Sequence, residues 1–221
     1  TPVSLDLTAA GSLPLVALTA WQVLIERGNV QPGQKVLIHS GAGGVGSIAI
    51  QLAKHLGAEV ATTAGGSNAD FVRSLGADTV IDYRTSDFEQ LLHGYDLVLD
   101  TLGGRNLEKS LRVLRPGGKA IGIAGPSDAA FARETGLNPL MRLALAGLSA
   151  GVRRRARKLG VSYEFLFMHA SGDQLRRVTA LVDEGVLSPV VGRVFPFDQT
   201  PEALESLRKG GMQGKVVVSR G

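Results

Sequence analysis

The sequence predicts an α/β protein built around a doubly wound, Rossmann-type parallel sheet of six strands. Short apolar runs alternate with helical segments along most of the chain, which is typical of parallel strands joined by crossover helices. One apolar run, at residues 36–38, leads into the glycines Gly41, Gly43 and Gly46, and a helical pattern follows at once. Hydrophobic residues make up 44% of the chain and charged residues 20%, which is ordinary for a protein with a sizeable core.

The strands of this sheet are predicted, in order, at residues 36–38, 58–63, 79–82, 95–100, 119–124 and 161–168. The run at 95–100 is apolar in its middle and acidic at its ends. A turn at residues 115–118, which contains Pro116, Gly117 and Gly118, is expected to precede the fifth strand. Residues 190–197 and 215–219 are also expected to be extended.

Helices are predicted at residues 12–27, from the glycine turn to Gly57, at 67–75, 86–92 and 104–114, in a broken run at 127–158, and at 172–184 and 200–209. Gly57 and Gly76 follow two of these helices, in the position where glycine commonly ends a helix. Pro201 lies in the first turn of the last helix, which is a favoured place for proline. No repeat or low-complexity segment interrupts the pattern.

The glycine turn predicts a site for a dinucleotide. In a strand–turn–helix unit of this kind, Gly41 permits the tight turn, Gly43 lets a pyrophosphate approach the backbone, and Gly46 lets the helix pack on the strand. The free N–H groups at the start of the helix, around Gly44 and Val45, face the phosphates, and the helix dipole favours their charge. The competing interpretation is a purely structural turn.

The end of the second strand favours NADP(H) over NAD(H). An NAD site places an acidic residue there to hold the ribose hydroxyls, but residues 64–68 contain none, and Glu59 lies at the other end of the strand. The missing carboxylate removes a repulsion toward a 2′-phosphate, and the polar stretch from Thr63 to Asn68 offers hydrogen bonds to it. The same absence argues against a methyltransferase that binds S-adenosylmethionine.

Composition excludes several other classes of function. A net charge of +4 with 5% aromatic residues is weak support for nucleic-acid binding. The chain has no cysteine, and therefore no disulfide and no thiolate nucleophile. Its longest apolar stretch, residues 137–152, contains Asn138, Arg142 and two glycines, so no membrane contact is expected. No signal peptide is visible, and the expected location is the cytoplasm.

Several segments together resemble the medium-chain dehydrogenase/reductase superfamily, in particular its zinc-independent quinone oxidoreductase branch. The matching segments lie at residues 13–21, 33–46, 49–54, 76–83, 96–104, 114–119 and 214–218. The resemblance implies an N-terminal GroES-like domain that precedes the first residue of this chain in family members. It further implies a cofactor-binding domain at residues 1–189 and a C-terminal return segment at residues 190–221, which packs toward that other domain.

The resemblance also assigns cofactor contacts. The pyrophosphate would lie on Gly43, Gly44 and Val45, and the adenosine 2′-phosphate would lie among Thr63, Ser67 and Tyr83. Asn68 stands where relatives often carry a lysine, and Arg73 or Arg84 would supply the missing charge. The other implied contacts are Leu102, Ile123 and Ala124 for the ribose and nicotinamide, the backbone of Phe165, Leu166 and Phe167 for the carboxamide, and Thr19 near the ring.

No residue of the chain is predicted to act as an acid, a base, a nucleophile or a metal ligand. His39 is expected to be a packed histidine at a strand end, and Ser40 lies outside any hydrolase motif. Asp100 is expected either to serve a turn or to face the cofactor, and the basic run at 153–158 to be a solvated helix face.

The predicted function is hydride transfer from NADPH to a quinone or to an α,β-unsaturated carbonyl compound. Two alternatives stay open: a Rossmann-like methyltransferase, and a non-catalytic module that senses NADPH. The expected assembly is a homodimer joined through the β-rich segment at residues 161–168, because an unpaired edge strand tends to find a partner.

Overall fold

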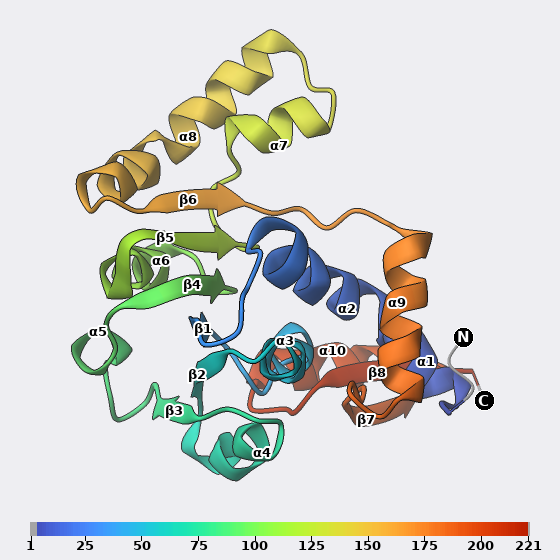
Figure 1. The fold of residues 1–221 in the computed structure, drawn as a ribbon. Helices are drawn as coiled ribbons and strands as arrows, with labels where there is room; N and C mark the ends of the chain where they lie inside the picture. Colours follow the sequence, from blue (N-terminus) through green and yellow to red (C-terminus); the bar gives the residue numbers. More distant parts are fainter. Residues whose placement is uncertain (1–3, 221) are drawn as a thin grey trace.

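The computed structural model describes residues 4–220, and its centre is a parallel sheet of six strands in the order β3-β2-β1-β4-β5-β6 (Figure 1). This is the strand order of dinucleotide-binding Rossmann folds, and it confirms the predicted fold class. The strands are β1 (Lys35–Ile38), β2 (Glu59–Ala64), β3 (Thr79–Asp82), β4 (Tyr95–Asp100), β5 (Leu114–Gly122) and β6 (Ser162–Phe165).

Helices cover both faces of this sheet (Figure 1). One face packs against α2 (Pro14–Trp21), the π-helix η1 (Gln22–Arg27), α3 (Gly44–His55) and α9 (Gly172–Asp183). The other face packs against α5 (Phe88–Leu91), α6 (Gly104–Val113) and α8 (Pro139–Lys158). The remaining helices are α1 (Leu7–Ser12), the short 3-10 turns η2 (Gly66–Asn68) and η3 (Phe197–Gln199), α4 (Ala69–Ser74), α7 (Ala129–Glu134) and α10 (Thr200–Lys209).

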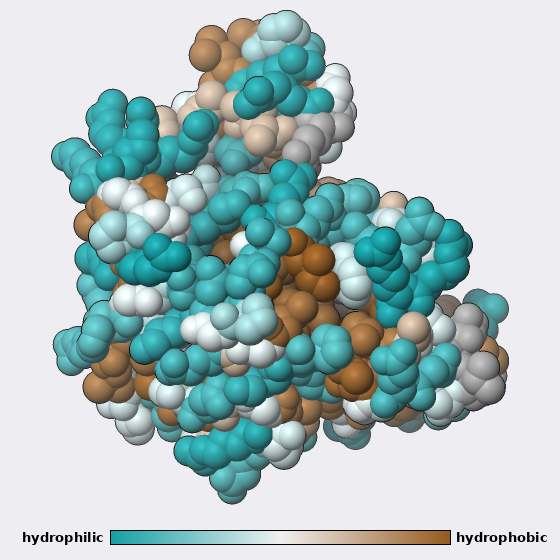
Figure 2. All heavy atoms as spheres, viewed as in Figure 1, coloured by the Kyte–Doolittle hydropathy of each residue, from teal (hydrophilic) through white to brown (hydrophobic). Residues whose placement is uncertain are grey.

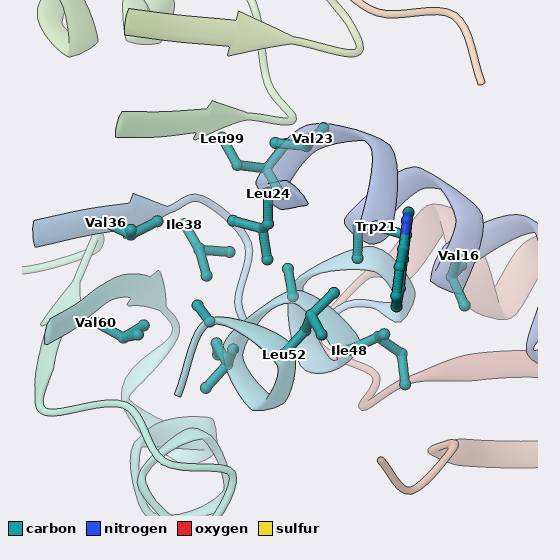
Figure 3. Packing of buried hydrophobic residues seen from close by; sticks show 14 of the residues in the cluster. Val16, Trp21, Val23, Leu24, Val36, Ile38, Ile48, Leu52, Val60 and Leu99 are labelled. Carbon is teal, nitrogen blue, oxygen red and sulfur yellow. The ribbon is translucent and has the colours of Figure 1, made fainter. Parts of the chain in front are cut away.

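The core follows from the alternation of side chains along each strand. In β1, Val36 and Ile38 point to the α3 face, whereas Leu37 points to the α6 face, and all three are fully buried. Figure 3 shows the first of these cores, where Trp21 of α2 and Ile48 of α3 face each other between the two helices. Because both faces are covered, the middles of the central strands are apolar, as at residues 36–38 of β1 and 97–99 of β4, which is usual for parallel sheets.

The structure corrects some predicted boundaries. The segment predicted as one helix at 12–27 is divided between the end of α1, α2 and η1. β5 begins at Leu114, which pairs with Tyr95, but the next pair is Leu97 with Lys119. Residues 115–118, predicted as a turn, therefore bulge out of β5 instead of preceding it.

Beyond the main sheet, β7 (Val191–Pro196) and β8 (Lys215–Ser219) form a parallel two-stranded sheet beside α10. These are the two segments predicted to be extended. The small sheet is fastened to the glycine turn, because Gly43 and Gly214 form a bridge and the Gly214 N–H donates to the Ala42 carbonyl at 2.7 Å. The C-terminal residues thereby return to the start of α3.

At the opposite end of the molecule, α7 and α8 form a hairpin that projects beyond the edge strand β6 (Figure 1). Among residues 4–220, no helix is both long and apolar enough to cross a membrane.

Candidate functional site

A cleft of about 620 Å³ opens at the carboxyl ends of the first four strands. It lies where the strand order reverses between β1 and β4, which is where open α/β sheets bind their ligands. The cleft is lined by His39, Ser40, Ala42, Gly43, Thr63, Ala64, Gly65, Asn68, Tyr83, Phe88, Leu102, Asn106, Gly211 and Met212. Five predicted cofactor residues are in this lining, namely Gly43, Thr63, Asn68, Tyr83 and Leu102.

Two glycines of the turn, Gly41 and Gly46, leave no room for a side chain. A Cβ on Gly46 would lie 2.2 Å from the Ser40 carbonyl oxygen, and one on Gly41 would lie 2.1 Å from the Thr62 hydroxyl. Gly41 therefore serves close packing, and the left-handed residue of the turn is Ser40, with φ 55°. A Cβ on Gly43 would meet only the Ser40 carbonyl at 3.3 Å, so the backbone there stays open to the cleft.

The start of α3 presents free N–H groups. Ser47 is the first residue of the helix whose N–H finds an acceptor one turn back, at the Gly43 carbonyl. The N–H groups of Gly44, Val45 and Gly46 precede it and lack such an acceptor. These groups, the open backbone at Gly43 and the dipole of a 12-residue helix fit a pyrophosphate. The sequence analysis did not identify Lys215, whose side chain lies against Gly44.

The tip of β2 has a positive charge close to it. A Cβ on Gly65 would lie 3.6 Å from the Arg84 guanidinium carbon and 3.7 Å from the Tyr83 hydroxyl. Arg73, the other predicted source of charge, instead forms an ion pair with Asp70 on α4 at 3.0 Å. Although residues 64–68 carry no acid, the Asp82 carboxylate of β3 also approaches this loop at Gly66. The tip is thus bordered by one cation and one anion.

Two of the predicted 2′-phosphate ligands are already engaged. Asn68 is buried, its Nδ2 donates to the Gly211 carbonyl at 3.4 Å, and its Oδ1 accepts from Gln213 Nε2 at 3.1 Å. The Thr63 hydroxyl accepts a hydrogen bond from the Ser40 N–H at 3.2 Å. Asn68 therefore fastens the 211–213 loop to the tip of β2 and also lines the cleft, and its contact with a 2′-phosphate stays a prediction. Ser67 is exposed beside the cleft and lies outside the lining.

His39 is buried at the end of β1, as predicted, and it also lines the cleft. Its Nδ1 lies 3.0 Å from the Thr63 hydroxyl, and its Nε2 lies 2.9 Å from the Ser110 hydroxyl. Burial lowers the pKa of His39 from 6.5 to about 4, against a smaller opposing effect from Asp100. The ring is neutral at pH 7 and both of its nitrogens have hydrogen-bond partners, which fits a positioning role.

The residues predicted for the nicotinamide half lie apart from the cleft lining, except Leu102. Thr19 is buried in α2, and its hydroxyl donates to the Leu15 carbonyl. The N–H of Leu166 donates to the Gly122 carbonyl, and that of Phe165 donates to Asp128. The other three are Ile123, half-buried, and Ala124 and Phe167, both exposed.

Asp100 serves the turn that follows β4. Its Oδ1 accepts hydrogen bonds from the backbone N–H groups of Leu102 and Gly103, at 3.1 and 2.6 Å. This holds Leu102 at the mouth of the cleft. The remaining lining residues that sequence reasoning missed are Phe88, Asn106, Gly211 and Met212. The last two come from the far end of the chain, and no local motif marks them.

The strand order, the glycine turn and the cleft at the switch point define a dinucleotide-binding domain of the Rossmann class. The family model described as zinc-binding dehydrogenase matches residues 75–218. The chain belongs to this family, within the medium-chain dehydrogenase/reductase superfamily.

Comparisons with individual proteins agree. The chain is 37% identical over 230 residues to the zebrafish (Danio rerio) protein named NAD(P)H oxidoreductase RTN4IP1, mitochondrial. That alignment spans 99% of this chain and 58% of the zebrafish protein. It is 35% identical to mycoketide-CoA synthase of Mycobacterium tuberculosis, of which it covers 5%. The structure of the quinone oxidoreductase from Coxiella burnetii superposes with a TM-score of 0.83 at 30% identity, over 99% of this chain and 62% of that one. The CurK enoyl reductase gives 0.82 at 30% identity, over 99% and 64%.

Proposed function

We propose that this chain is the cofactor-binding part of an NADP(H)-dependent oxidoreductase that reduces a quinone or an α,β-unsaturated carbonyl compound. The family, the cleft at the switch point, and relatives named NAD(P)H oxidoreductase, quinone oxidoreductase and enoyl reductase support this proposal. The chain spans 58% of the length of that zebrafish relative, so the activity belongs to the proposal for the whole protein. Neither the methyltransferase nor the sensor alternative gains support from the comparisons.

The observation that carries the choice of NADP(H) is the position of Arg84. Its guanidinium lies beside Gly65 at the tip of β2, next to the Tyr83 hydroxyl, and no acidic side chain pairs with it among residues 4–220. A guanidinium binds a phosphate through charge-assisted hydrogen bonds. Arg84 thus compensates for the asparagine at position 68. The Asp82 carboxylate at the same loop repels a phosphate, so the preference for NADP(H) over NAD(H) depends on the balance between Arg84 and Asp82.

Calorimetric titration with NADPH and with NADH tests this proposal. We expect NADPH to bind at least about tenfold more tightly, and Arg84→Gln to remove most of that difference, which corresponds to about 1.4 kcal/mol. Arg73→Gln is the matched control, because Arg73 is a neighbouring arginine already paired with Asp70. Equal affinities in the unmodified protein would contradict the preference for NADP(H).

When bound, the nicotinamide would supply a hydride from C4 to the substrate. The residues of this chain would bind the pyrophosphate at the start of α3 and hold the adenosine at the tip of β2. His39 and Thr63 would keep the floor of the cleft in place. We assign no proton donor to this chain. Consumption of NADPH in the presence of a simple quinone, by the whole protein, would separate an enzyme from a sensor.

The zinc-independent character is also a proposal, although the matching family is described as zinc-binding. The chain has no cysteine, and no group of three or more histidine, aspartate or glutamate side chains in residues 4–220 could hold a metal ion. Metal analysis of the purified whole protein tests it. Stoichiometric zinc that is required for turnover would contradict it.

The remaining proposals concern assembly and location. Within the part of the chain that the structure describes, the outer edge of β6 pairs with no strand, which supports pairing with a second copy. Phe197, Leu204 and Leu207 are exposed beside β7, which supports packing of residues 190–221 against a further domain. A cytoplasmic location is kept as proposed. Light scattering tests the homodimer, which a monomer at micromolar concentration would contradict.

A further inference from the structure

Positive charge is concentrated in one segment of the chain. Residues 135–163 contain six of the 24 lysine and arginine residues and none of the 20 aspartate and glutamate residues. This segment therefore carries a formal charge of +6, whereas the rest of the chain carries −2. Most of the segment is helix α8, which forms one arm of the projecting hairpin (Figure 1). An anionic surface would attract this end of the molecule and weakly repel the remainder.

The first half of α8 exposes an apolar face. Leu140, Leu143 and Leu148 are 77%, 71% and 63% exposed, although α8 buries Ser149 and Ala156 on its opposite face. In the view of Figure 2, brown atoms lie at the top of the hairpin and teal atoms gather to the left, toward the C-terminal end of α8. Exposed leucines in such a group are unusual for a surface that meets only water.

The basic residues continue the same face. Arg154 and Lys158 follow Leu140 by 14 and 18 residues, close to whole numbers of helical turns, so all three lie on one side of α8. Both are exposed, and neither has an acidic partner in the part of the chain that the structure describes. Arg157 is also exposed and follows Leu143 by 14 residues, so it lies on the side of Leu143. Arg155 is paired with Glu108. One face of α8 therefore carries exposed leucines in its N-terminal half and unpaired cations near its C-terminus.

This combination fits a lipid surface better than a second copy of the chain. A second copy could cover the leucines, but residues 135–163 offer no carboxylate to pair with Arg154 and Lys158. An anionic membrane satisfies both halves, because acyl chains accept leucines and headgroups accept cations. Since α8 is not apolar enough to span, it would lie in the interface.

We propose that the solvent-facing side of α8 docks the protein on anionic phospholipid membranes, with Leu140, Leu143 and Leu148 inserted and Arg154, Arg157 and Lys158 at the headgroups. This departs from the expectation that the basic run is only solvated and that the chain meets no membrane. It is independent of the proposed redox activity.

Vesicle sedimentation tests the proposal with the intact protein. We expect the protein to sediment with vesicles of phosphatidylcholine that contain about 30% phosphatidylglycerol, and to stay in solution with phosphatidylcholine alone. High salt should weaken the binding. No binding to the anionic vesicles, or equal binding to both, would overturn the proposal.

Two variants separate the contributions. Replacement of the three leucines by glutamine, or of Arg154, Arg157 and Lys158 by glutamine, should each lower vesicle binding at least tenfold. All six side chains are exposed, so thermal unfolding should change little. In the matched control, glutamine replaces Arg176, Arg177 and Arg208, which are three exposed arginines on α9 and α10. This control variant should retain most of the vesicle binding. Equal losses in the control would show general charge attraction and overturn the assignment to α8.

A label distinguishes lipid from protein as the occupant. Because the chain has no cysteine, Leu143→Cys can carry a single polarity-sensitive dye. A blue shift that requires anionic vesicles supports membrane insertion. A blue shift that grows with protein concentration alone would show that a second copy covers the face, and would overturn the proposal.

Discussion

The two sheets of this protein differ in how completely the chain covers them. Within β1 and β4, most residues are buried between helices on both faces. Within residues 191–196 of β7, Phe195 is the buried side chain, while Val194 is 48% exposed, and Val218 of β8 is 37% exposed. The large sheet carries its own core. The small sheet depends on its attachment to the glycine turn, because two strands alone are marginally stable.

The largest expected difference in stability between the two sheets comes from two glycines that have no room for a Cβ, one next to each sheet. A Cβ at Gly46 would lie 2.2 Å from the Ser40 carbonyl, and one at Gly192 would lie 1.9 Å from the Gln213 carbonyl. We expect Gly46→Ala to lower the free energy of unfolding by about 4 kcal/mol and to abolish dinucleotide binding, because only backbone could move. Gly192→Ala should displace β7 and leave the large sheet folded.

Chemical denaturation followed by far-ultraviolet circular dichroism measures both variants. A similar loss of stability in the two would contradict the contrast, and would show that the two sheets unfold as one cooperative unit.

A core truncation sharpens the same comparison. Leu99 of β4 is fully buried, so Leu99→Ala should lower the free energy of unfolding by about 3 kcal/mol through lost contacts and a cavity. Val218→Ala should cost less than about 1 kcal/mol, because Val218 is partly exposed. If Val218→Ala costs as much as Leu99→Ala, the small sheet contains a core of its own.

Acid should weaken the large sheet through His39. The folded-state pKa of about 4 lies below the ordinary 6.5, so the unfolded chain takes up a proton first as the pH falls. The stabilising effect is complete above pH 6.5 and is lost between 6.5 and 4, with about 2 kcal/mol gone between pH 7 and pH 5. Denaturation at several pH values measures this, and His39→Asn should flatten the dependence. An unchanged slope in that variant would assign the effect to other groups.

A small effect is also expected where the two sheets are joined near the cleft. Asn68→Ala removes hydrogen bonds to Gly211 and Gln213 and should cost about 1 kcal/mol of unfolding free energy. Gln213→Ala should cost less, and the double variant should lose little more than Asn68→Ala alone, because the two share one bond. Additive losses would mean that Asn68 and Gln213 act separately.

The parts of the fold that could be predicted are those whose signals are local. The strand at residues 79–82, the helix at 200–209 and the glycine turn all have their cause within a few neighbouring residues, and the structure confirms them. The bulge at 115–118 depends on the partner strand, because it arises where Leu97 pairs with Lys119. Local propensity gives no sign of such a register shift.

The phosphate half of the candidate site was predicted from a local motif, whereas the predictions for the nicotinamide half came from the family resemblance. Gly43, Gly44 and Val45 follow from one motif. Asn68 was predicted near a 2′-phosphate; it lines the cleft, and it also contacts Gly211, 143 residues away in the sequence. Such a contact exists only after the chain has folded, so a single sequence could not disclose it. The residues implied for the nicotinamide lie outside the described cleft, apart from Leu102.

The β-bridge between Gly43 and Gly214 connects the glycine turn to the C-terminal sheet, so nucleotide binding at the turn is coupled to the ordering of that sheet. The Gly214 N–H donates to the Ala42 carbonyl, and Gly43 is also the residue that a pyrophosphate would approach. A nucleotide that tightens this turn also tightens the strand that begins at Lys215. Thermodynamic reciprocity then requires that whatever docks on the small sheet raise the nucleotide affinity by the same factor by which the nucleotide favours docking.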